Sequence, residues 1–145
     1  GSHARPDVGA DGKGFIIVWQ QSRGDVHGIC GTRVSTAGKV IDMPAHTYAE
    51  TGSSPALAVS TGKALVAWAV KERNSGKTAA ALVDPTTGRK TKDLGIINTC
   101  CGDGPAVAHD GKEGFITVAG RASVPDPWGW GGPGAVVGGP SRGPS

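Results

Sequence analysis

The sequence has few of the residues that membrane spans, metal sites or large aromatic cores require. Only 5% of its 145 residues are aromatic, and it contains one methionine and three cysteines. No run of 18 apolar residues occurs, so we expect no membrane span. No Cys-x-x-Cys motif with a matching histidine pair occurs, so the sequence predicts neither a structural zinc site nor another cofactor.

The chain also lacks a strong charge, because its formal net charge is only +3. Its basic residues include two small groups, at 71–77 and 89–92, without the interleaved aromatic residues of a nucleic-acid surface. We therefore expect solvated surfaces there and no nucleic-acid partner. Residues 1–3 resemble the remnant of an expression tag, and we exclude them from function.

The three cysteines, Cys30, Cys100 and Cys101, leave at least one thiol without a partner inside the chain. The adjacent pair could form a vicinal disulfide, or one member could bridge to Cys30. Unpaired thiols in or near packed strands are an equally good interpretation.

Glycine and proline are abundant, with 25 and 10 residues, and both disfavour the interior of a helix. Short apolar runs between turn residues instead predict an all-β protein. One stretch occurs three times, as PDVGADGKGFIIVW (6–19), PALAVSTGKALVAW (55–68) and PAVAHDGKEGFITV (105–118). Pro6 and Pro55 are 49 residues apart, and Pro55 and Pro105 are 50 apart, which indicates a repeat architecture.

Each copy of this stretch predicts a hairpin. Its proline cannot donate a ladder hydrogen bond and so suits the start of a strand. The turns fall at Asp11-Gly12, Thr61-Gly62 and Asp110-Gly111. The apolar run that follows is typical of a strand buried on both faces. Trp19 and Trp68, at the ends of these runs, are predicted to pack between neighbouring units.

Two more strands are predicted after each hairpin, at 26–34 and 39–41 in the first unit and at 78–83 and 89–94 in the second. In the third unit, residues 135–137 take the place of the third strand, and the tail favours no fourth strand. The unit boundaries are therefore 4–52, 53–102 and an incomplete 103–139, followed by a tail at 140–145.

A four-stranded antiparallel unit of about 49 residues has the size of a β-propeller blade. A β-trefoil, which also has three repeats, is the main alternative, and a sandwich is another. Three blades do not close a ring and would leave apolar faces open. We expect the chain to be a fragment of a longer propeller or to associate, for example as a two-fold symmetric, six-bladed homodimer.

The pattern Pro-x-Val-Ala-x-x-Gly-x-x-Phe-x-Val-x-Trp, followed by a polar loop and a Gly-x-x-Val-Ser-x-x-Gly segment, resembles blade-like repeats of large bacterial secreted or surface proteins. The matching segments are 5–19, 28–38, 55–68 and 105–118. The resemblance implies a β-propeller built from such blades and a secreted or cell-surface location. It implies no catalytic residue.

No arrangement of residues predicts catalysis. His27, His46 and His109 are expected at different places in the repeat: the third strand, the loop between units and the first strand. The aspartates near glycines are turn residues rather than a calcium ladder, and no Gly-x-Ser-x-Gly elbow occurs. We expect a non-enzymatic binding or scaffold module for a glycan or a protein. The alternative is a fragment of a propeller hydrolase, which would need paired carboxylates facing one cavity.

Trp128 and Trp130 are the candidate ligand-binding residues, because exposed aromatic rings in a Gly/Pro-rich segment can stack on sugar faces or peptides. The alternative is that this segment covers the open end of the third unit. On a glycan array, we expect the protein to bind a sugar and the Trp128→Ala/Trp130→Ala variant to lose that signal. Binding that is absent in the wild type, or unchanged in the variant, would contradict a lectin role.

Overall fold

The computed structural model describes residues 2–60, 62–72, 75–98, 104–109, 114–119 and 135–138. These residues form strands, turns and bends, so the all-β prediction is confirmed. The described part of the chain contains no helix that is long and apolar enough to cross a membrane.

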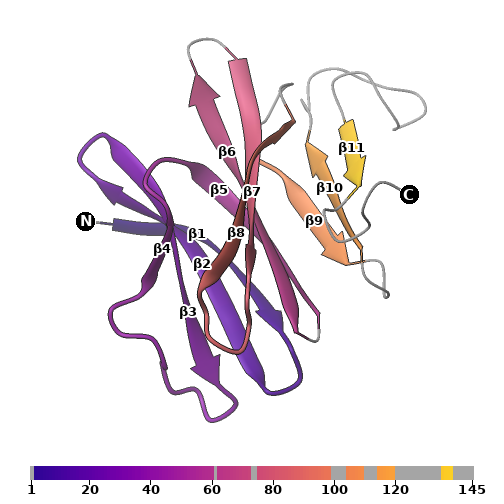
Figure 1. Ribbon diagram of the computed structural model, residues 1–145. Coiled ribbons are helices and arrows are strands. Elements are labelled where there is room, and N and C mark those ends of the chain that lie inside the picture. Colours follow the sequence, from indigo (N-terminus) through magenta and orange to yellow (C-terminus); the bar gives the residue numbers. More distant parts are fainter. Residues whose placement is uncertain are drawn as a thin grey trace.

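The strands form three antiparallel sheets, each with its strands in chain order (Figure 1). Sheet 1 contains β1 (Ser2–Ala10), β2 (Gly14–Arg23), β3 (Val26–Ser35) and β4 (His46–Ala49). Sheet 2 contains β5 (Ser53–Ser60), β6 (Lys63–Glu72), β7 (Ser75–Val83) and β8 (Lys90–Asn98). Sheet 3 contains β9 (Ala106–His109), β10 (Phe115–Ala119) and β11 (Ala135–Gly138).

The hairpins of sheets 1 and 2 have the same register at an offset of 49 residues. Val8 pairs with Ile17 in sheet 1, and Leu57 pairs with Val66 at the equivalent positions of sheet 2. The strand predicted at 135–137 is present as β11, where Val137 pairs with Thr117. The sequence repeat is therefore also a structural repeat.

We expected the three repeat prolines to begin strands, but two of them do not. Pro6 and Pro55 lie inside β1 and β5, where the pairing shifts register. The residue before each proline has a positive φ, at 51° for Arg5 and 51° for Ser54. A proline is tolerated at such a bulge because the ladder hydrogen bond is already interrupted there. Only Pro105 directly precedes its strand.

Two other strand predictions need correction. The fourth strand of sheet 1 is β4 rather than residues 39–41, because Val40 forms only an isolated bridge with Val34. His46 therefore lies in a strand and not in a loop between units. Neither Trp19 nor Trp68 ends its strand, since β2 and β6 each continue for four more residues. Backbone pairing with β3 and β7, which does not depend on the polarity of the side chains, keeps these segments in the ladder.

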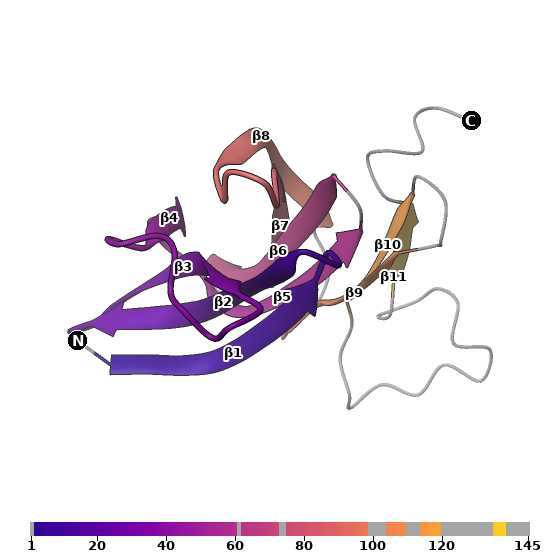
Figure 2. The same cartoon turned by 90° about the horizontal axis from the view of Figure 1, so that it is seen from below.

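The sheets follow one another in space as they do in the chain, and Figure 2 shows them side by side. β1 packs against β5, and β5 packs against β9. We call the face of a sheet that points to the preceding sheet its upstream face, and the opposite face its downstream face. One core cluster joins the downstream face of sheet 1 to the upstream face of sheet 2, through Ile16, Val18, Val66 and Trp68. A second cluster joins sheets 2 and 3, where Leu65 and Ala67 lie with Val107.

Burial differs between the two equivalent central strands. All six residues from Ala64 to Ala69 in β6 are buried, as the sequence predicted for an apolar run. In β2 only Ile16 and Val18 are buried, whereas Phe15 is 40% exposed. The prediction of burial on both faces is thus wrong for β2, because no described sheet covers the upstream face of sheet 1.

The two equivalent tryptophans allow a matched test of this asymmetry. Trp68 is 4% exposed and packs in the core, whereas Trp19 is only half-buried. At concentrations where the chain is monomeric, we expect Trp68→Ala to lower the free energy of unfolding by about 3–5 kcal/mol. Trp19→Ala should cost less than half as much, measured by urea unfolding. Equal losses would contradict the difference in packing.

Candidate functional site

Arg33, Asp42 and Tyr48 of sheet 1 form a polar contact with the turn between β7 and β8 of sheet 2, which we call the seam. Arg33, at the end of β3, donates through Nε to Asp42 Oδ2 at 3.0 Å and through Nη2 to Asp42 Oδ1 at 2.8 Å. Its Nη1 also donates to the carbonyl of Thr86 in the turn between β7 and β8. A bidentate guanidinium–carboxylate pair fixes both direction and distance, so Asp42 holds Arg33 in place for this contact.

Tyr48 of β4 makes the deepest of these contacts. It is the largest fully buried side chain among the described residues, and its hydroxyl donates to the carbonyl of Gly88 at 2.7 Å. Lys90 Nζ donates in turn to the Tyr48 carbonyl at 3.2 Å. Gly88 has a φ of 75°, and a Cβ there would lie within 3.1 Å of atoms of Asp42, His46 and Arg33. Glycine suits this backbone conformation, and any larger residue would displace these three side chains.

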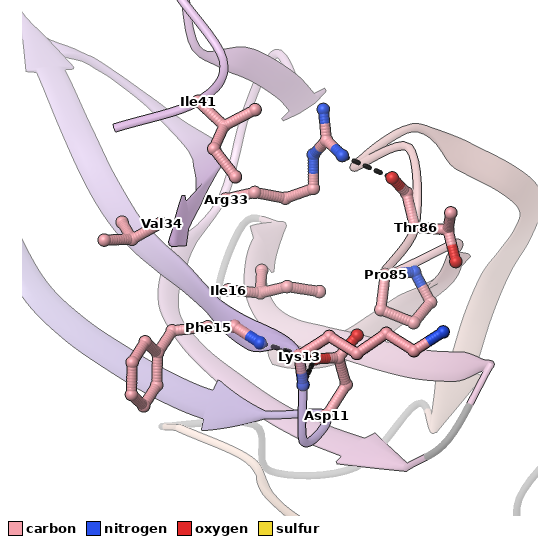
Figure 3. Close-up of a pocket in the computed structure, with 10 residues that line it drawn as sticks. Asp11, Lys13, Phe15, Ile16, Arg33, Val34, Ile41, Pro85 and Thr86 are labelled. Atoms are coloured by element: carbon pink, nitrogen blue, oxygen red, sulfur yellow. Dashed lines mark hydrogen bonds between the residues drawn. The ribbon is translucent and has the colours of Figure 1, made fainter. Parts of the chain in front are cut away.

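A small cavity of about 140 Å³ lies at this seam (Figure 3). Sheet 1 contributes Phe15, Ile16 and Arg33, and sheet 2 contributes Pro85 and Thr86. Two sets of hydrogen bonds lie around it: Asp11 Oδ1 accepts from the Lys13 and Gly14 amides, and Arg33 Nη1 donates to the Thr86 carbonyl. The Asp11 bonds hold the β1–β2 turn, and the Arg33–Thr86 bond joins the two sheets.

The protonation of the seam follows from its contacts. The hydrogen bonds from Arg33 hold the pKa of Asp42 at about 2, well below its usual value. Burial raises the pKa of the Tyr48 hydroxyl, which therefore remains a donor at neutral pH. The Asp42 Oδ2 atom also lies 3.3 Å from His46 Nε2. Asp42 is thus ionised at neutral pH and supplies the negative charge that pairs with Arg33.

The histidines do not form one site. His27 Nδ1 lies 2.6 Å from the Ser22 hydroxyl, His46 lies beside Asp42, and His109 belongs to β9 in sheet 3. In the described part of the chain, no three His, Cys, Asp or Glu side chains gather as they would around a metal ion. Burial raises the pKa of the Cys30 thiol, which keeps it protonated and weakly nucleophilic.

Several residues singled out in the sequence lie outside the described part of the chain. They are Trp128, Trp130, Cys100 and Cys101. The glycan-binding role of the two tryptophans and the pairing of the two cysteines therefore remain predictions.

A second candidate surface is the upstream face of sheet 1. Val8 and Ile17 are cross-strand partners on this face, as are Phe15 and Val34. Val8 is 57% exposed, although the equivalent Leu57 in sheet 2 is buried. The same holds for Phe15 and its buried equivalent Ala64. The open face of sheet 1 thus corresponds, position for position, to a face that sheet 2 buries against its neighbour.

Trp19 lies on this face with its polar atom unsatisfied. Its indole Nε1 is buried, and no described residue accepts a hydrogen bond from it. Its ring contacts only the tilted ring of His3 among the described aromatic rings, at 5.9 Å between centroids. A buried N–H without an acceptor is unfavourable, and a partner on this face could supply one.

Neither comparison with known proteins identified a relative. No protein-family model matches the chain, and no curated protein matches it significantly. The sequence reasoning also missed the Arg33–Asp42–Tyr48 fastening. Tyr48 is the chain's single tyrosine, which was the one available signal, but its partner Gly88 lies 40 residues away.

Replacing Asp42 should reduce the loss of unfolding free energy that occurs as the pH falls. Because the folded pKa of Asp42 is about 2 and the unfolded value is about 3.9, its contribution is complete above about pH 4 and is lost as the pH falls toward about 2. We expect Asp42→Asn to lower the free energy of unfolding at neutral pH by about 1–3 kcal/mol.

Urea unfolding across this pH range checks the expectation. The difference between the wild type and Asp42→Asn should shrink as the pH falls. Asp25→Asn, in the exposed β2–β3 turn, is the matched control and should stay within about 0.5 kcal/mol of the wild type. A constant difference at all pH values would show that the Asp42 carboxylate is not the group responsible.

Proposed function

We propose that the chain is a run of β-propeller-type blades that acts as a non-enzymatic scaffold or binding module and associates through the upstream face of sheet 1. Two features support blades. Every strand pairing within a described sheet joins strands of the same repeat unit, in simple chain order. The first strands of successive units, β1, β5 and β9, pack against one another, as the innermost strands of stacked blades would.

The observation that carries the assembly is the open face of sheet 1. Its apolar residues occupy the positions that sheet 2 buries completely or nearly so, at a constant offset of 49 residues. Repeat units of this kind gain their stability by stacking, because one unit cannot bury both faces alone. An exposed contiguous apolar face of this type is characteristic of an interaction site.

The ligand of such a module is a glycan or a protein, and the resemblance to bacterial surface repeats favours a secreted or cell-surface location. In this proposal the stacked sheets supply the rigid support, and Trp128 and Trp130 belong to a segment that presents the ligand-binding rings. The fastening of sheet 1 to sheet 2 by Arg33 and Tyr48 supports this rigidity.

The assembly is tested by the mass of the chain in solution. We expect multi-angle light scattering to give a mass above that of the 14.5 kDa monomer for the wild type. Val8→Asp should give a monomer, because a charge without a partner is costly to bury at an interface. Val8 is exposed, so the variant should fold normally.

Met43→Asp is the matched control, since Met43 is 82% exposed in the loop before β4, outside both sheet faces. This variant should keep the wild-type mass. A monodisperse monomer for the wild type, or an unchanged mass for Val8→Asp, would contradict the proposed function.

A further inference from the structure

Both contacts between sheets follow the same rule. The downstream face of sheet 1 packs on the upstream face of sheet 2, and the downstream face of sheet 2 packs on the upstream face of sheet 3. The two faces are chemically different. In the middle of the first strands, the downstream residues Gly9 and Ala58 are small. The upstream residues Val8, Leu57 and Val107 beside them are larger.

The small residues allow the first strands to approach closely. A Cβ on Gly9 would lie 2.5 Å from Val59 Cγ2, which is far closer than packed carbon atoms come. At the next contact, Ala58 belongs to the cluster against which Val107 packs. A small downstream residue beneath an apolar upstream side chain is therefore the recurring feature of these contacts.

Within the described residues, one face of each kind has no neighbouring sheet. The upstream face of sheet 1 is open at Val8 and Phe15. On sheet 3, Ala106 and Ala108 occupy the downstream positions equivalent to Ala56 and Ala58 of sheet 2, at an offset of 50 residues. Ala56 and Ala58 are buried, but Ala106 and Ala108 are exposed. Among the described residues, nothing therefore covers Ala106 and Ala108 as sheet 3 covers Ala56 and Ala58.

We propose that the upstream face of sheet 1 docks on the downstream face of sheet 3 in a second copy of this chain. This inference rests on the proposed function and specifies the partner surface. The contact repeats the two that the chain already makes internally, with Val8 of one copy over Ala108 of the other. It is heterologous, because two different faces meet, and a dimer contains it twice.

The backbone hydrogen bonds fit this choice of partner. At the contact between sheets 1 and 2, the Leu57 amide donates to Asp7 Oδ2 of the preceding sheet at 2.8 Å. The equivalent amide in sheet 1, that of Val8, donates instead to Oδ1 of Asp7, the preceding residue in the same strand, at 2.9 Å. At the position of Asp7, sheet 3 carries Ala106, which has no acceptor in its side chain. Because the Val8 amide already has an acceptor, the missing acceptor at Ala106 leaves no hydrogen bond unmade in this contact.

Mixing two variants tests the heterologous contact. Val8→Asp blocks the upstream face of sheet 1, and Ala108→Asp blocks the downstream face of sheet 3. Both residues are exposed in the single chain, so each variant should keep the wild-type circular dichroism spectrum. Each variant alone should run as a monomer, because every contact in its homodimer contains one blocked face.

A mixture of the two variants should recover a dimer by light scattering. One contact then joins the intact sheet 1 of the Ala108→Asp chain to the intact sheet 3 of the Val8→Asp chain. Met43→Asp should remain dimeric throughout as the control.

Two outcomes would overturn the inference while leaving the proposed function in place. One is an Ala108→Asp variant that keeps the dimer mass, which indicates that sheet 1 packs on sheet 1 of the partner. The other is a mixture that stays monomeric although both variants are folded and the wild type is dimeric. A monomeric wild type would instead contradict the proposed function itself.

Discussion

The packing of the downstream face of one sheet on the upstream face of the next is the interaction on which this structure depends. The stabilisation from such packing grows with the apolar area removed from water. A sheet with two apolar faces is therefore stable only between two neighbours. Sheet 2 has both neighbours and contributes most of the core, whereas sheet 1 has one and leaves Val8 and Phe15 exposed.

Apolar packing alone does not fix how two sheets are oriented, because it has little directional preference. The polar groups at the edge of sheet 1 supply that direction. Tyr48 and Arg33 reach carbonyls in the turn between β7 and β8, and Asp42 holds the guanidinium in a bidentate pair. These contacts bring residues 40 to 53 positions apart into one seam. The same seam keeps sheet 1 in position to present its open face.

The repeat explains both the regular features and the exceptions. The residue before each of the three prolines has a positive φ, although only the third, Gly104, is a glycine. The left-handed conformation and the bulge recur at Arg5 and Ser54, at equivalent positions of sheets 1 and 2, whereas Gly104 has a φ of 154° and lies outside its strand. Equivalent residues behave differently where one unit has a preceding sheet and the other has none. Asp7 serves the Leu57 amide with one oxygen and the Val8 amide with the other, because sheet 1 has no preceding sheet within the described chain.

The sequence by itself determined the all-β class, the repeat period and most hairpins, because alternation and turn glycines act over a few residues. It also placed the third strand of the last unit at residues 135–137, where the structure has β11 (Ala135–Gly138). Only the tertiary structure decided that β4 begins at His46, that Tyr48 bonds Gly88, and that Trp19 and Trp68 differ in burial. These features depend on which sheet lies next to which, and residues with the same local sequence pattern acquire different surroundings only when the units stack.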